Sequence, residues 1–145
     1  KLEEGAKKAE QQLLTTANQV QTQLLTLLDI AWQEGRKEDA AAIAQTSEAV
    51  ARALCLGEYG ARVAQFQLYC LEKDADKGAQ IFLELWDALS APWEITSPLY
   101  HHLPTKEDAQ GFSQLRTFLL RSLQTDDSME FLRNHPKIQA LLSSQ

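Results

Sequence analysis

The chain has 145 residues, 44% of them hydrophobic, and a formal net charge of −6. A chain of this length can bury a core of its own, and its hydrophobic fraction argues against disorder. The negative charge and the scattered lysines and arginines disfavour binding to nucleic acid. The longest apolar stretch, residues 24–32, is too short to cross a bilayer, so we expect no membrane span.

The first residues, Lys1-Leu2-Glu3-Glu4, already belong to a charged helical pattern. Such a start is typical of a shortened chain, and a leader or anchor that has been removed is compatible with it. The sequence has no recognisable signal peptide. The compartment of this soluble domain therefore stays open, with the cytoplasm favoured.

Apolar residues spaced by three and four predict one long amphipathic helix within residues 1–34. The stripe is formed by Leu2, Ala6, Ala9, Leu13, Ala17, Val20, Leu24, Leu27 and Ala31. Gly35 suits the left-handed position that follows a helix C-terminus. Because coiled coils need apolar residues at these intervals, the stripe is also compatible with a homo-oligomer formed through residues 2–31.

Three further helices are expected within residues 36–90. The second helix starts near Glu38 and Asp39, where the helix dipole favours carboxylates, and ends before Gly57. Its many alanines let neighbouring helices approach closely on more than one side, so we expect it to be central. Its predicted buried row is Ile43, Ser47, Val50 and Leu54.

The third and fourth helices are expected to pack against each other on either side of a polar turn at residues 73–76. Asp74 or Asp76 can accept hydrogen bonds from the free N–H groups at the start of the fourth helix. The third helix, about residues 59–72, is predicted to turn inward Tyr59, Val63, Phe66 and Cys70. The fourth helix is predicted to carry on one face Ala79, Phe82, Trp86 and Leu89, with Ile81 and Leu85 beside that face.

The two cysteines, Cys55 and Cys70, are interpreted as buried free thiols. Cys55 falls at the turn before the third helix, and Cys70 is expected about 15 Å further along that helix. A disulfide needs Cα atoms within about 7 Å of each other, so we expect no disulfide.

Residues 91–104 hold three of the four prolines and predict a crossover loop. The loop also holds large apolar residues, so we expect it to be ordered and to pack along the helices. They are Trp93, Ile95, Leu99, Tyr100 and Leu103.

Residues 105–145 are expected to form the C-terminal helices. Thr105 is predicted to cap the fifth helix, and shorter helices are predicted from Asp126 or Asp127 and from Pro136. The fifth helix is predicted to turn inward Phe112, Leu115, Leu119 and Leu123. Since no stretch alternates with the period of a β-strand, we predict a single all-α domain, residues 1–145, of antiparallel helical hairpins.

The sequence predicts two similar units, each formed by a helix, a short polar turn and a second helix, at residues 27–54 and 66–89. Aligning Gly35 with Asp74 gives an internal offset of 39 residues. The first unit resembles a tetratricopeptide helical hairpin, with Gly35 at the turn and Ala40 five residues later, and the resemblance covers about residues 24–92. The chain departs from that family at Ala31, where an aromatic residue is expected, and in its offset, which exceeds the family's 34 residues.

The adjacent residues His101 and His102 are the first candidates for chemistry. Neighbouring side chains diverge, so the two could not easily bind one metal ion, and the sequence lacks the usual HExxH or CxxC spacings. Neither a nucleophile elbow nor a glycine-rich phosphate loop is present. We therefore predict no catalytic, cofactor-binding or metal-binding residues and no cofactor.

The sequence favours a non-enzymatic domain that binds a protein or peptide, or scaffolds an assembly, through the groove between its stacked hairpins. Its acidity favours basic or amphipathic partners. The exposed side of the crossover is the first place to look for a binding surface, with Trp93, Tyr100, His101 and His102 as candidates. Two alternatives stay open: a structural domain that self-associates through the N-terminal helix, and a small enzyme or metal protein that uses His101 or His102.

Overall fold

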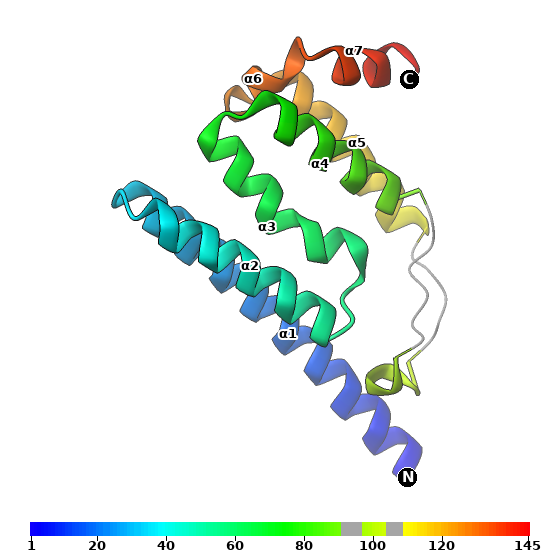
Figure 1. The fold of residues 1–145 in the computed structure, drawn as a ribbon. Coiled ribbons are helices and arrows are strands. Elements are labelled where there is room, and N and C mark those ends of the chain that lie inside the picture. The colour runs from blue at the N-terminus through cyan, green and yellow to red at the C-terminus, as the bar shows by residue number, and fades with distance from the viewer. Residues whose placement is uncertain (91–96, 104–108) are drawn as a thin grey trace.

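A computed structural model of the protein describes residues 1–90, 97–103 and 109–145, with the side chains of the last range described from residue 114 onward. Within these ranges all regular secondary structure is helical, which confirms the predicted all-α class (Figure 1). The α-helices are α1 (Leu2–Gln33), α2 (Lys37–Ala53), α3 (Gly57–Glu72), α4 (Ala75–Ala88), α5 (Ala109–Thr125), α6 (Glu130–Arg133) and α7 (Pro136–Ser143). Two 3-10 helices are η1 (Pro98–Tyr100) and η2 (Asp127–Met129).

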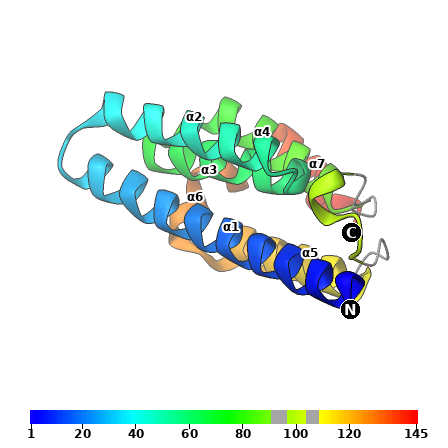
Figure 2. The ribbon, with the colours of Figure 1, turned by 90° about the horizontal axis from the view of Figure 1, so that it is seen from below.

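The helices pack mainly against their neighbours in the chain. The long helix α1 pairs with α2, and α3 packs between α2 and α4. Seen from below, α2 and α4 lie on one side of the molecule, and α1 and α5 lie on the other (Figure 2). Helices α6 and α7 contact α4, so the C-terminal segment returns to the end of the stack that is far from α1.

The first three helices end in the same way. Gly35, Cys55 and Lys73 each adopt a left-handed conformation, with φ of 79°, 55° and 55°. The N–H group of the following residue then bonds a carbonyl five residues back, which is the Schellman motif. These bonds are Arg36 to Ala31 at 2.8 Å, Leu56 to Ala51 at 2.8 Å and Asp74 to Tyr69 at 3.2 Å.

Helix-end geometry corrects the predicted alignment of the two hairpins. Matched by their left-handed residues, Gly35 corresponds to Lys73 rather than to Asp74, which shortens the offset by one residue. In this register, buried Leu28 corresponds to buried Phe66. The predicted register had instead matched Phe66 with Leu27, which is 50% exposed.

Two clusters of buried side chains form the core. The larger one surrounds α4 and confirms the four-residue face predicted for that helix. It also includes Ile81 and Leu85, which were predicted beside that face, and Leu119 and Leu123 of α5. The smaller one joins α1, α2 and α3 and is built largely from small residues. Its buried members are Leu28, Ala31, Ala40, Ala44, Ala64 and Leu68.

The inward faces predicted for the first three helices are partly wrong. In α1 the buried face is rotated away from the predicted stripe, so that Leu2 and Leu27 are exposed. Because the alanines of α2 let α1 and α3 approach closely, the alanines themselves are buried, and Ile43, Val50 and Leu54 lie at the margin. The buried residues of α2 are Ala40, Ala44, Ser47 and Ala51. Those of α3 are Ala61, Ala64, Phe66 and Leu68, and only Phe66 among them was predicted.

The two thiols differ in environment. Both are free, as predicted, but Cys55 is exposed because it is the left-handed residue of the α2–α3 turn, so its predicted burial was wrong. Cys70 is partly buried. Burial raises the pKa of the Cys70 thiol to about 12, with a smaller contribution from the carboxylate of Asp126.

Polar side chains fix α1 against its neighbours. Gln21 and Ser47 are both buried and exchange two hydrogen bonds. The Gln21 Nε2 donates to the Ser47 carbonyl oxygen at 2.9 Å, and the Ser47 hydroxyl donates to Gln21 Oε1 at 2.6 Å. Gln67 of α3 donates to the Leu25 carbonyl oxygen of α1 at 3.0 Å. These side-chain contacts hold α1 in one register against α2 and α3.

Candidate functional site

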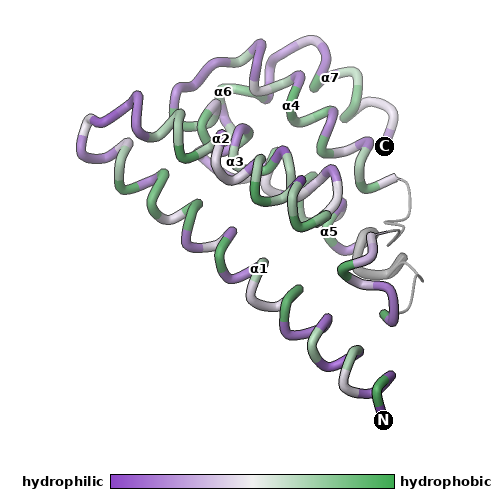
Figure 3. The backbone as a smooth tube through the Cα atoms, turned by 60° about the horizontal axis from the view of Figure 1, so that its bottom comes forward, coloured by the Kyte–Doolittle hydropathy of each residue, from purple (hydrophilic) through white to green (hydrophobic). Residues whose placement is uncertain are grey.

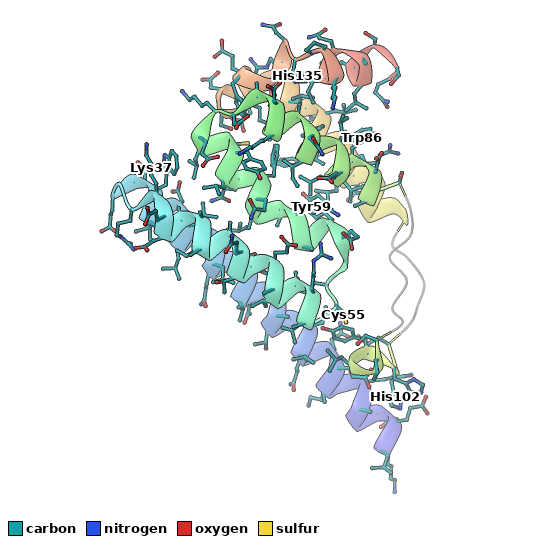
Figure 4. All side chains as sticks on the ribbon, in the orientation of Figure 1. Lys37, Cys55, Tyr59, Trp86, His102 and His135 are labelled. Carbon is teal, nitrogen blue, oxygen red and sulfur yellow. The ribbon has the colours of Figure 1, made fainter. Side chains whose placement is uncertain are left out.

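The described part of the crossover, Ser97–Leu103, is held against α1 and the end of α2 (Figure 4). We call it the crossover segment. The Ser97 side chain caps η1 by accepting from the Leu99 N–H group at 3.1 Å. Tyr100 is 1% exposed, and its hydroxyl donates to the carbonyl oxygen of Leu54 at 2.5 Å. The prediction that the crossover packs along the helices is confirmed for this segment.

A second attachment joins His102 to Glu10 of α1. The His102 backbone N–H donates to Glu10 Oε1 at 2.7 Å, and the ring Nδ1 lies 2.6 Å from Glu10 Oε2. Burial disfavours the charged form of Glu10, but the two hydrogen bonds from His102 and the nearby charge of the imidazoles outweigh it and lower the carboxyl pKa. Because an ionised carboxylate can only accept hydrogen bonds, we place a proton on His102 Nδ1.

Of the four predicted surface residues, the structure describes Tyr100, His101 and His102, and these three have different environments. Trp93 lies outside the described residues. Tyr100 is buried, so it is not part of an exposed recognition surface. His101 is exposed and presents its ring edge-on to His102, with 4.9 Å between ring centroids. His102 serves to attach the crossover to α1, through a carboxylate that sequence reasoning did not single out.

The outer side of α1 has a different character, because it carries no charge over five turns. Residues 11–28 contain no Asp, Glu, Lys or Arg, although 23% of the whole chain is charged. We call the exposed residues of this stretch, with Ile30, the neutral face. They are Gln11, Gln12, Thr15, Thr16, Asn18, Gln19, Thr22, Gln23, Thr26, Leu27 and Ile30.

The neutral face combines two apolar side chains with hydroxyl groups that are already hydrogen-bonded. Leu27 is 50% exposed and Ile30 is 44% exposed. The hydroxyl of Thr22 donates to the Asn18 carbonyl oxygen, and that of Thr26 donates to the Thr22 carbonyl oxygen, both at 3.1 Å. Because these hydroxyl groups already donate to protein carbonyl oxygens, removing them from water on binding costs less free energy.

Charged residues border the neutral face at its two ends. Lys7 and Lys8 precede it, Asp29 lies near its end between Leu27 and Ile30, and Glu34 follows it. Helix α1 forms one edge of the molecule, so its outer side is open to solvent (Figure 3). Sequence reasoning missed this surface because it followed the apolar stripe; the run of 18 residues without a charge was the signal that could have revealed it.

The third histidine, His135, has structural contacts of its own. His135 caps α7 by accepting from the Lys137 N–H group with Nδ1 at 3.2 Å, and its Nε2 lies 2.9 Å from Asp76 Oδ1. In the part of the chain that the structure describes, no group of three His, Cys, Asp or Glu side chains could hold a metal ion. No helix of the described ranges is long and apolar enough to cross a membrane.

Comparisons of the chain with protein-family models, with curated proteins and with solved structures give no match.

Proposed function

We propose that the protein is a non-enzymatic interaction domain and that the neutral face of α1 is its docking surface. The observation that carries this proposal is the uninterrupted absence of charge on an exposed helix face in an otherwise charged protein. The buried centre of a protein interface is depleted in charged residues, because each desolvated charge must find a partner.

The composition of the face supports the same function. Leu27 and Ile30 supply apolar area that the fold leaves uncovered, and glutamine and threonine supply adaptable hydrogen bonds. The charged residues at both ends correspond to the polar rim that surrounds an interface centre. The rigid attachment of α1 through Gln21 and Gln67 presents this face without the need to order it on binding.

A photo-crosslinking residue tests the proposal in cells of the source organism. Placed at Gln19 or Gln23, it is expected to capture protein partners, a second copy of the chain included. Placed at the control positions Gln45 of α2 or Gln124 of α5, which are also exposed glutamines, it is expected to capture none. Equal capture from all four positions, or none from α1, would contradict the proposal.

A further inference from the structure

We propose that the neutral face binds a second copy of the chain, with the two α1 helices antiparallel across a two-fold axis. This inference rests on the proposed function, because it names the partner of the same surface. A two-fold arrangement makes each contact twice and closes on itself, so it yields a dimer and not a fibre.

The charge distribution of α1 favours an identical partner. A charged partner surface would lose its hydration against the neutral face and find no counter-charge there. The same face of a second copy carries no charge over residues 11–28 and so avoids this loss. The neutral face is therefore complementary to itself.

The borders of the face select the antiparallel direction. When Asn18 of one helix faces Gln19 of the other, Lys8 of each copy lies at the level of Asp29 of its partner, so basic and acidic borders meet twice. The parallel direction instead places lysine beside lysine and aspartate beside aspartate, which is repulsive. Glu3 and Glu34 share a level in the antiparallel register, but Glu34 is already paired with Arg36 at 2.6 Å.

The apolar residues fit the same register. Leu27 of one copy lies at the level of Glu10 of the other, whose carboxylate contacts His102, and comes beside Ala9. Ile30 comes beside Lys7 and Lys8, whose methylene groups can cover it. Ala9 is exposed and small, so it leaves room for the leucine. Each of these contacts occurs twice in the dimer.

Sedimentation velocity over a range of protein concentrations, at low ionic strength, tests the inference. We expect a monomer–dimer equilibrium that high salt weakens, since salt screens exposed charges. Lys8→Glu is expected to weaken association roughly tenfold, because two exposed pairs change from attraction to repulsion. Asp29→Lys is expected to do the same, and the double variant Lys8→Glu/Asp29→Lys is expected to restore association.

Controls separate the possible outcomes. Lys137→Glu on α7 makes the same charge change away from α1 and should leave association unaltered. Leu27→Gln should weaken association without unfolding the chain, which circular dichroism checks. A monomer at every concentration, or a double variant that is not restored, overturns the dimer. If crosslinks from Gln19 still capture other proteins, the proposed function stands without the dimer; if neither is seen, both fail.

Discussion

At the scale of single residues, one buried polar pair, Gln21 and Ser47, joins α1 to α2. Ser47 is fully buried, and its hydroxyl is the donor to Gln21 Oε1. Removing that hydroxyl leaves a buried acceptor without a partner, which is more destabilising than removing both groups together. Register between α1 and α2 therefore depends on a pair that contributes no apolar area.

Ser47→Ala is expected to lower the free energy of unfolding by about 1–3 kcal/mol. Its neighbour provides the control, because the hydroxyl of Thr46 is exposed and donates only to the Ala42 carbonyl oxygen of its own helix. Thr46→Ala should change stability by less than about 0.5 kcal/mol. Urea denaturation of both variants checks the difference, and equal losses would contradict a special role for the Gln21–Ser47 pair.

The Glu10–His102 contact predicts a dependence on pH. The folded state lowers the pKa of Glu10 below its ordinary value of 4.5. The stabilisation is therefore present above pH 4.5 and is lost as the pH falls through the lower folded pKa. Measured by urea denaturation, Glu10→Gln should destabilise the protein near neutral pH, and the difference from the native chain should shrink below pH 4.5. A difference that stays constant with pH would argue against an ionised Glu10.

At the scale of elements, the turns explain why the hairpins form where they do. The left-handed position is occupied by glycine at Gly35 but by residues with side chains at Cys55 and Lys73. A side chain in this conformation is strained by contact with the backbone, at about 1–2 kcal/mol. The strain persists because helices on both sides of each turn are packed.

Lys73→Gly is expected to raise the free energy of unfolding by up to about 1 kcal/mol, since glycine adopts φ of 55° without strain but loses more entropy on folding. Gln80→Gly, at an exposed position within α4, should instead lower it by about 1 kcal/mol. Thermal unfolding of the two variants checks the opposite signs. A loss of stability in both would contradict the strain at Lys73.

The sequence pattern predicted the buried face of a helix best where that face carries large apolar side chains. The α4 face was predicted completely, and Asp74 caps that helix as expected, accepting from the Lys77 N–H group at 3.1 Å. In α2 the pattern misled, because alanines that seemed only to permit close packing became the buried residues themselves. The predicted Thr105 cap and the inward position of Phe112 fall outside the described residues and side chains and stay predictions.

At the scale of the whole molecule, the position of the C-terminal helices depends on a close contact with α4. A Cβ atom added to Gly78 would lie 3.0 Å from Leu132 Cδ2 and 3.2 Å from Phe131 Cε2. Leu132 is fully buried and cannot easily move. Glycine at this position therefore lets α6 approach α4, although glycine is unfavourable within a helix.

Gly78→Ala is expected to destabilise the protein by about 1 kcal/mol or more, because crowding at α6 exceeds the gain in helix propensity. Gly5→Ala is the matched control, since a Cβ atom there meets nothing within 4 Å. That variant should be neutral or stabilising by up to about 1 kcal/mol. Urea denaturation checks both, and a gain of equal size at Gly78 would show that α6 can move away.

The candidate site was predicted less well than the fold. The crossover was expected to pack on the helices, and its described segment, residues 97–103, does so, but its anchor Glu10 is 92 residues distant from His102 in the sequence. No local pattern connects such residues, since their meeting depends on the path of the whole chain. The neutral face could have been predicted only from an absence, that of charged residues over residues 11–28. The pattern of apolar residues drew attention away from it.

The separation of 92 residues between Glu10 and His102 also has a consequence for synthesis of the protein. Helices α1 to α4 contact mainly their sequence neighbours, so they can fold as they leave the ribosome. Glu10 must wait until His102 has been made before its carboxylate gains a partner. Until then the part of α1 around Glu10 lacks the contacts that it makes with the crossover segment in the finished chain.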